Sequence, residues 1–270
     1  AIRLLSCLRG WLRGELDRMH PVRVPTAEAE ALRHLARDRG QLLKEVGQHR
    51  DRIRKLLRTV GCWVSVDAKF ATRLDQEVIR CHDGTPLPRW LYDRLRRECE
   101  RLALAEQQFK ALEKALPKLV PDEVGKDMQH LYQLRGIGGV GSFRMMLELF
   151  WRSFSNRRQV GACLGLVPQP YDSGQSRVDQ GISKQSNGRL RSLAIEMGWM
   201  WIRYQPDSKI TRWYLEHIAG NSTNKRSKRI AIVAVARRLV IALWRYLKDG
   251  GLPEGSVLKP VPRRTRKQPA

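Results

Sequence analysis

The residues best suited to chemistry in this chain are a serine beside a glycine and three cations a few residues further on. Ser173 stands in the short run Asp-Ser-Gly, and no histidine lies near it in the sequence. Its hydroxyl alone is a poor nucleophile, so the run taken by itself predicts a turn. Lys184, Arg189 and Arg191 lie on a loop that leads into an expected helix. Positive charge beside a helix N-terminus is suited to holding a phosphate.

A glycine cluster upstream, Gly136-Ile-Gly138-Gly-Val-Gly141, matches the G-x-G-x-x-G pattern of dinucleotide-binding folds letter for letter. That pattern requires a buried strand before it and an acidic residue about 20 residues after it. A helical pattern precedes the cluster here, and no acidic residue lies between Glu148 and Asp172. The context therefore argues against a dinucleotide site.

The same glycines fit a helix-hairpin-helix better. Two short amphipathic helices flank them, and the second shows Val140, Phe143, Leu147 and Phe150 on one face. Glycines allow the tight turn, and the free backbone N–H groups that follow can bind a phosphate whatever the base sequence. A plain glycine turn in a helical domain remains the alternative.

Two long heptad patterns predict the scaffold that precedes the glycines. Residues 32–60 repeat apolar positions in steps of three and four, broken only by Arg39 and His49, and residues 91–116 repeat the same spacing until Pro117. Two such helices joined by a connector favour an antiparallel hairpin in which each buries the apolar stripe of the other. An arm of a helical bundle and a dimerisation coiled coil both fit this pattern.

The rest of the chain reads as short helices separated by turns. A stretch rich in Pro, Gly and Ser, residues 168–188, is expected to be a loop. We expect a hairpin over residues 25–118, a helical domain over 119–250 with the helix-hairpin-helix near 128–150, and a basic disordered tail over 251–270.

Charge indicates the class of partner. The 270 residues include 51 Lys and Arg against 27 Asp and Glu, a net charge of +24, and 42% are hydrophobic. Such an excess on a chain able to bury a core points to a polyanion. The most apolar stretch, residues 230–244, is too short for a membrane span and holds two arginines. Five scattered cysteines favour reduced thiols in a cytoplasm, and the six histidines form no metal motif.

The motifs in order resemble a known family. GIGGVG, GLVP, DSG and GISKQSNGRLR are similar to the C-terminal half of the DEDD transposases of the IS110 insertion-sequence family, which are bridge-RNA-guided recombinases. The likeness is strongest over residues 128–215, and the heptad hairpin agrees with the coiled coil of that family. The resemblance implies a mainly α fold, with residues 1–24 as the remnant of a RuvC-like α/β domain, then a coiled coil that joins protomers, then a helical transposase domain.

The resemblance also implies roles for residues. Ser173 corresponds to the family's nucleophile, which attacks a DNA phosphate. Mg²⁺ would be held by four acids of the RuvC-like domain, and residues 1–14 contain no Asp or Glu that could replace them. We therefore expect no metal site in this chain and no cleavage by the chain alone. The residues expected to bind DNA are Gly136, Gly138, Gly141, Arg177, Lys184, Asn187, Arg189 and Arg191.

The expected partners are DNA, a guide RNA and further copies of the chain, as a dimer or tetramer, with no membrane. The expected location is the bacterial cytoplasm, at the nucleoid. Two alternatives stay open. In one, the chain is a non-catalytic helix-hairpin-helix DNA-binding protein in which Ser173 is only a turn residue; in the other, it is a pseudogene product without activity.

Overall fold

The chain is mainly helical in a computed structural model. The structure describes residues 2–19, 24–173, 176–183, 186–219 and 224–260. They contain ten α-helices and one two-stranded antiparallel sheet, which confirms the mainly α prediction. No helix in these ranges is both long and apolar enough to cross a membrane. The chain divides into two compact units, Ala1–Ala31 and Leu32–Ala270.

The first unit contains α1 (Ile2–Leu12), a short helix with an apolar surface. Its side chains Ile2, Leu4 and Leu12 are exposed. Gly10 is buried beside an ion pair in which Arg18 Nε lies 2.7 Å from Glu15 Oε2. One helix without a described strand does not test the RuvC-like origin of this segment, which stays a prediction.

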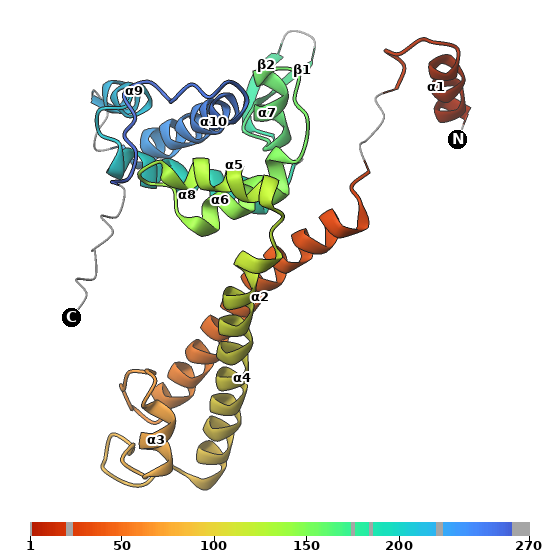
Figure 1. The fold of residues 1–270 in the computed structure, drawn as a ribbon. Coiled ribbons are helices and arrows are strands. Elements are labelled where there is room, and N and C mark those ends of the chain that lie inside the picture. The colour runs from red at the N-terminus through yellow and green to blue at the C-terminus, as the bar shows by residue number, and fades with distance from the viewer. Residues whose placement is uncertain (1, 20–23, 174–175, 184–185, 220–223, 261–270) are drawn as a thin grey trace, which may run out of the picture. The chain divides into compact units, whose positions relative to one another are not determined.

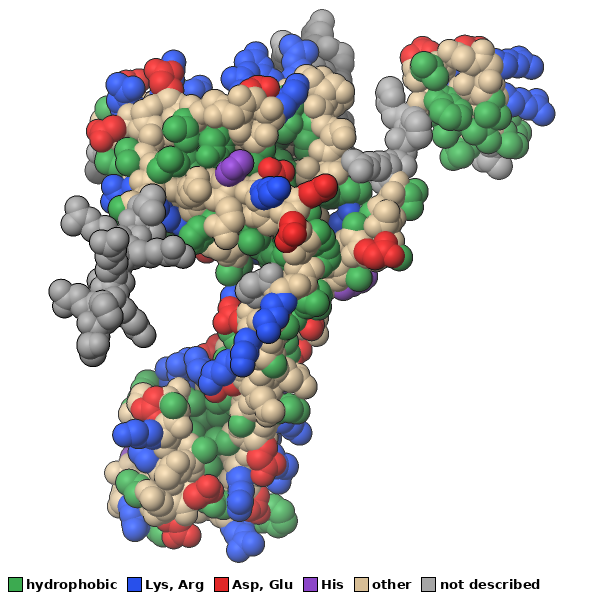
Figure 2. Space-filling view, in the orientation of Figure 1, with side chains coloured by type: hydrophobic (Ala, Val, Ile, Leu, Met, Phe, Trp, Pro, Cys, Tyr) green, Lys and Arg blue, Asp and Glu red, His purple; other side chains and the backbone are tan. Residues whose placement is uncertain are grey.

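Helices α2 (Ala27–Arg58) and α4 (Arg89–Leu119) form the expected antiparallel hairpin (Figure 1). Ion pairs between the helices show the direction of the pairing, because residue numbers rise along α2 while their partners' numbers fall along α4. These pairs are Arg39 with Glu113, Arg50 with Glu106 at 2.6 Å, and Arg52 with Glu98 at 3.6 Å. On the face seen in Figure 2, Lys and Arg side chains form a row across the hairpin and mix with Asp and Glu toward its tip.

The polar interruptions of the heptads are paired across the hairpin. His49 Nδ1 donates to Glu98 Oε2 at 2.7 Å, and Arg101 Nη1 donates to Glu98 Oε1 at 3.0 Å. Burial of Glu98, which is 4% exposed, by itself raises the pKa of its carboxyl. The His49 hydrogen bond and the charges of Arg52 and Arg101 outweigh burial and hold that pKa below its ordinary value.

The tip of the hairpin contains a small hydrophobic core of its own, where the sequence predicts only a connector between the two helices. It is built around α3 (Phe70–Asp75), whose Phe70 and Leu74 are buried. They pack with the ends of the two long helices and with the connecting segments. The other buried members are Ile53, Leu57, Cys62, Val66, Ile79 and Leu95.

The elements after the hairpin share one main core. In chain order they are α5 (Asp122–Gln133), α6 (Gly139–Met145), the π-helix η1 (Met146–Phe150), α7 (Arg157–Cys163), β1 (Pro168–Ser173), β2 (Ser176–Ile182), α8 (Gly188–Tyr204), α9 (Lys209–Ile218) and α10 (Lys225–Asp249). Buried residues of α5, α8 and α10 meet in this core, among them Leu131, Leu193 and Leu239. The hairpin joins these helices through Arg33, whose Nε donates to the Leu147 carbonyl at 3.1 Å.

Residues 251–260, which the sequence assigns to a disordered tail, pack against the body instead. Leu258 forms a bridge with Leu134, and Lys259 N donates to Gln133 O at 2.7 Å. The Gln205 side chain donates to the carbonyls of Arg135 and Val257 at 2.9 and 2.8 Å. These backbone bonds depend on partners far away in the chain, which composition does not reveal. The remaining tail, 261–270, lies outside the described residues.

The Glu98 cluster makes a prediction for stability. We expect Glu98→Ala to lower the free energy of unfolding at pH 7 by about 2 kcal/mol, because it leaves His49 without its partner inside the seam. Because the folded-state pKa of Glu98 is depressed, its stabilisation is present above the unfolded-state pKa of about 4.3 and is lost as the pH falls through the folded-state pKa. Urea unfolding across pH 3 to 7 measures both effects.

Glu100→Ala is the matched control, since Glu100 lies on the same helix and its side chain is 70% exposed. Its ion pair with Arg96 is long, at 3.9 Å. We expect this change to shift the unfolding free energy by less than about 0.5 kcal/mol. Equal losses for the two variants would show that the buried pair contributes nothing special.

Candidate nucleic-acid interface

The glycine cluster forms the expected helix, turn and helix. Helix α5 ends at Gln133, the turn follows, and α6 begins at Gly139. Gly136 has φ +85°, a conformation that favours glycine. A Cβ there would lie 3.0 Å from the carbonyl oxygen of Met200 on α8, so the turn sits directly on the main chain of that helix.

The three glycines expected to bind DNA differ in their surroundings. Gly141 is buried, and a Cβ there would contact Met197 Sδ at 3.5 Å, so both Gly136 and Gly141 serve close packing against α8. Gly138 is exposed, has open space beside it and precedes the first turn of α6. No side chain caps this helix start, so its first N–H groups are available to an external acceptor. Gly138 is thus the member of the set that fits phosphate binding.

Cations surround the turn. Lys259 Nζ donates to the Ile137 carbonyl at 2.7 Å and lies 3.4 Å from the centroid of the Tyr132 ring. Burial lowers the pKa of its ammonium group. A pocket of about 770 Å³ lies beside the turn, and its lining includes four cations and one acid: Arg39, Arg135, Arg144, Lys259 and Glu196. Arg39 and Arg144 are paired with Glu113 and Glu148, so Arg135 and Lys259 are the cations left to favour an anion near the free N–H groups.

The segment expected to be a loop contains a two-stranded ribbon. In β1 and β2, Pro168 pairs with Ile182 at the base and Ser173 pairs with Ser176 at the turn. The prolines of β1 are tolerated because both strands of a two-stranded ribbon are edges, where an N–H can be missing. Lys184 and the side chains of Ser173 and Arg177 lie outside the described residues. The backbone places Ser173 at the last position of β1.

The loop that enters α8 is held in place by its own side chains. Asn187 Oδ1 accepts from the N–H groups of Arg189 and Leu190 at 3.1 and 3.3 Å, so it caps the helix. Its Nδ2 donates to Glu148 Oε2 at 3.2 Å, in the π-helix. Arg144 Nε lies 3.5 Å from the other oxygen of Glu148. The structure thus gives Asn187 a positioning role, whereas Arg189 is exposed.

Gly165 joins two of the sequence motifs in space. Its φ is +63°, and a Cβ there would collide with the Ser183 carbonyl oxygen and the Ser186 hydroxyl. Ser186 in turn accepts from Arg191 Nη1 at 3.0 Å, so Arg191 holds this loop. Sequence reasoning missed both Gly165 and Glu148. The spacing of Arg144 and Glu148 by four residues is a signal for an ion pair on one helix face, but the contact at Gly165 has no local signal.

Comparison with known proteins agrees with these motifs. The model of the transposase IS116/IS110/IS902 family matches residues 128–212. A protein of Sinorhizobium fredii described as a transposase, y4rJ, is 36% identical over 266 residues, which cover 95% of this chain and 67% of that protein. The chain belongs to the IS116/IS110/IS902 transposase family.

More distant relatives include transposases of two insertion sequence elements. The transposase of IS1111A from Coxiella burnetii is 27% identical over 241 residues, covering 85% of this chain and 62% of the relative. The transposase of IS1328 from Yersinia enterocolitica is 25% identical over 240 residues, covering 86% and 67%. The chain thus spans about two thirds of the length of these relatives.

The ribbon separates Ser173 from the start of α8, and both lie inside the region that matches the family model. Five residue steps lie between Pro168 and Ser173, which at about 3.3 Å per step places Ser173 roughly 17 Å from the base of the ribbon. Residue 183 directly follows the base, and the Ser183 N–H donates to the Val167 carbonyl at 2.9 Å. The structure therefore brings Asn187, Arg189 and Arg191 together at the start of α8, whereas Ser173 lies at the other end of the ribbon from its base.

The described part of this transposase offers no metal ligand set. No three His, Cys, Asp or Glu side chains gather there so as to hold an ion. Glu148 accepts from Asn187, and Glu98 is occupied by His49 and Arg101. These residues do not fit the Mg²⁺ that the family's chemistry implies.

Gly165 makes a prediction for the loop. We expect Gly165→Ala to destabilise the protein by at least about 2 kcal/mol, because the new methyl group strains a positive φ and displaces Ser183 and Ser186. We also expect weaker DNA binding, since Arg189 and Arg191 follow the displaced loop. Thermal unfolding and a DNA-binding titration measure the two effects.

Gly47→Ala is the control, because Gly47 lies within α2 with no atom within 4 Å of its Cβ position. There alanine should stabilise the helix by about 0.5–1 kcal/mol and leave DNA binding unchanged. A Gly165→Ala protein with wild-type stability and binding would contradict the close approach.

Proposed function

We propose that this transposase cuts and rejoins DNA at the ends of an insertion sequence through attack of Ser173 on a phosphodiester. The observation that carries the proposal is the position of Ser173 at the turn of a ribbon inside the region that matches the family. A hydroxyl at a hairpin turn can approach a DNA strand without displacing the core. The resemblance assigns the nucleophile to this same serine.

The proposed step exchanges one ester for another. A bond forms between Ser173 Oγ and phosphorus, one P–O bond of the DNA strand breaks, and the released DNA hydroxyl takes up the proton that the serine hydroxyl gives up. The phosphoserine link retains the bond energy for rejoining. Arg189 and the N–H groups that follow Gly138 would bind neighbouring phosphates and hold the strand. The described residues contain no cluster of His, Cys, Asp or Glu side chains that could hold a metal ion for this step.

Guidance by RNA is part of the proposal and comes from the resemblance. Its support in this chain is the basic character of the hairpin, where Lys and Arg side chains gather in a row (Figure 2). Such a surface binds an RNA backbone by charge and shape without reading its sequence.

Assembly into a homo-oligomer is proposed as well, in a bacterial cytoplasm. The apolar stripes of α2 and α4 cover each other within the chain, as Leu42, Ile53 and Leu95 show by their burial. Contact between protomers would therefore use residues outside this seam. Trp63 and Trp90, at the hairpin tip, are 77% and 83% exposed and suit such a contact.

A non-catalytic DNA-binding protein is the second candidate. The observation that favours it is the uncapped, exposed start of α6 at Gly138, which suits phosphate binding whether or not Ser173 reacts. In that case the ribbon turn would have no chemical role. The two candidates differ in what the loss of one hydroxyl does.

The nucleophile assignment predicts that Ser173→Ala abolishes transposition and leaves DNA affinity unchanged. A bacterial transposition assay, with the substitution carried in the complete coding sequence, measures the first effect. Denaturing gels measure a second expected effect, the loss of the covalent intermediate. The phosphoserine link should appear in the wild type as a protein–DNA adduct that survives detergent, and it should be absent in the variant.

Ser176→Ala is the matched control, because Ser176 is the cross-strand partner of Ser173 and has the same side chain. It should transpose normally. If Ser173→Ala transposes like the wild type while Arg189→Ala abolishes transposition, the nucleophile assignment falls and the DNA-binding candidate stands.

A further inference from the structure

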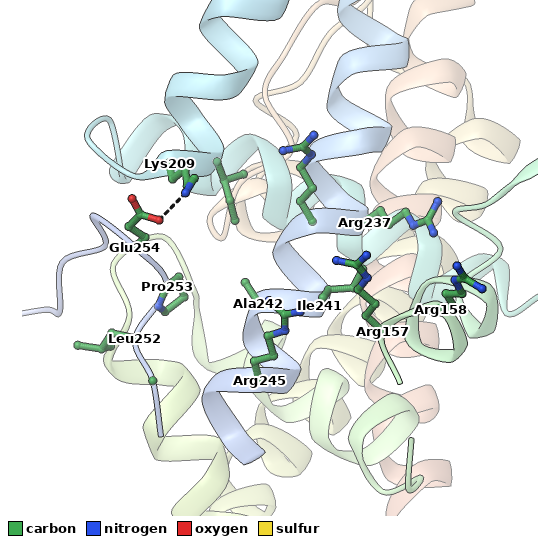
Figure 3. A pocket seen from close by; sticks show the side chains of 13 residues that line it. Arg157, Arg158, Lys209, Arg237, Ile241, Ala242, Arg245, Leu252, Pro253 and Glu254 are labelled. Atoms are coloured by element: carbon green, nitrogen blue, oxygen red, sulfur yellow. Dashed lines mark hydrogen bonds and ion pairs between the residues drawn. The ribbon is translucent and has the colours of Figure 1, made fainter. Parts of the chain in front are cut away.

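A strongly basic pocket shares no lining residue with the ribbon or the glycine turn. It has a volume of about 760 Å³ and is lined by α7, α10, the start of α9 and the segment after α10 (Figure 3). Six of its lining residues are cationic and one is acidic: Arg157, Arg158, Arg237, Arg238, Arg245, Lys209 and Glu254. None of these belongs to the residues that the sequence assigns to DNA.

The single acidic residue of the pocket, Glu254, forms an ion pair with Lys209. Glu254 Oε2 lies 2.8 Å from Lys209 Nζ, at the end of the pocket opposite Arg157, Arg158 and Arg237 in Figure 3. The Lys209 hydrogen bond and charge hold the pKa of Glu254 below its ordinary value. Within the described part of the chain none of the five arginines forms an ion pair, so their charges repel one another without compensation.

Two of the arginines are positioned by contacts with neighbouring helices. Arg237 lies against α7, because a Cβ on Gly161 would be 2.9 Å from its Nε. Arg238 stacks on Trp213, with its guanidinium carbon 3.9 Å from the ring centroid. Arg237 and Arg245 occupy the same face of α10, eight residues apart, which is about 12 Å along the helix axis. A row of planar guanidinium groups suits bidentate binding of phosphate oxygens.

We propose that this pocket binds the sugar–phosphate backbone of double-stranded DNA, as a second grip separate from the ribbon. A DNA strand carries one phosphate per about 3.4 Å of helix axis, so the row from Arg237 to Arg245 spans about three phosphates. The pocket floor is apolar, with Ile210, Ile241 and Leu252, which fits the sugar edge between phosphates. Membership in a transposase family favours DNA over other polyanions.

The test is the double substitution Arg158→Gln with Arg245→Gln in the 270-residue chain, because both side chains are exposed and their loss leaves the core intact. Binding to a duplex of random sequence is titrated at several salt concentrations. We expect about tenfold weaker binding near 0.1 M salt and a log–log salt slope smaller by about two, since two phosphate contacts are lost. The loss should be equal for duplexes of different sequence.

Arg9→Gln with Arg13→Gln is the matched control, since it removes the same charge from exposed positions outside the hairpin that is proposed to bind RNA. If the control weakens binding as much, the effect is one of net charge and the pocket proposal fails. The proposal also fails if the pocket variant binds duplex DNA with wild-type affinity, or if it loses affinity only for single-stranded RNA. Ser173→Ala should bind like the wild type, so failure of the nucleophile assignment stays distinguishable.

A measurement on the unmodified chain guards against misfolded variants. Phenylglyoxal, which modifies exposed arginines, should react with Arg158 and Arg245 in the free protein and several-fold more slowly when duplex DNA is bound. Arg9, which is exposed and lies outside the hairpin, serves as the internal reference. Equal reaction of Arg158 and Arg245 with and without DNA would overturn the proposal.

Discussion

The close packing of α8 is the constraint on which the other C-terminal elements depend. Gly198 lets α10 approach, because a Cβ there would already lie 3.4 Å from Ile232 and Val235. On another side the glycine turn rests on the main chain of α8, with Gly136 against the Met200 carbonyl. Glycines that resemble a phosphate-binding loop are thus first of all a condition for packing.

Hydrogen bonds at both ends of α8 connect it to neighbouring elements. At its start, Asn187 caps the helix and reaches Glu148 in the π-helix. At its end, Trp201 Nε1 donates to Ser208 Oγ at 2.8 Å, and the same hydroxyl caps α9. Gln205 then fixes the segment after α10 by accepting from the Val257 N–H at 2.8 Å. The glycine turn packs on α8 and Arg189 lies in its first turn, so a displacement of α8 would move both.

The parts of the fold that follow from local periodicity were predictable from the sequence. The hairpin is of this kind, and even its irregular positions, Arg39 and His49, mark where ion pairs cross it. The parts that depend on distant partners were not predictable. Gly165 meets a loop 18 residues later, and the ribbon after it forms in a stretch whose prolines and glycines are typical of a loop. Asn187 shows why site residues are hard to predict from sequence. Its side-chain amide is of a type that could bind a phosphate, but in the structure it caps α8.

The length of the ribbon constrains how DNA could reach Ser173. The serine lies roughly 17 Å from the ribbon base, which corresponds to about five base-pair steps of a duplex running along it. In the proposed reaction, Arg189, in the first turn of α8, would not neutralise the phosphate at Ser173, because a charge more than a Debye length of about 10 Å away is largely screened. In this proposal, cations near the base would set the position of the duplex instead. The proposed reaction would then need a source of charge other than Arg189 to stabilise the reacting phosphate.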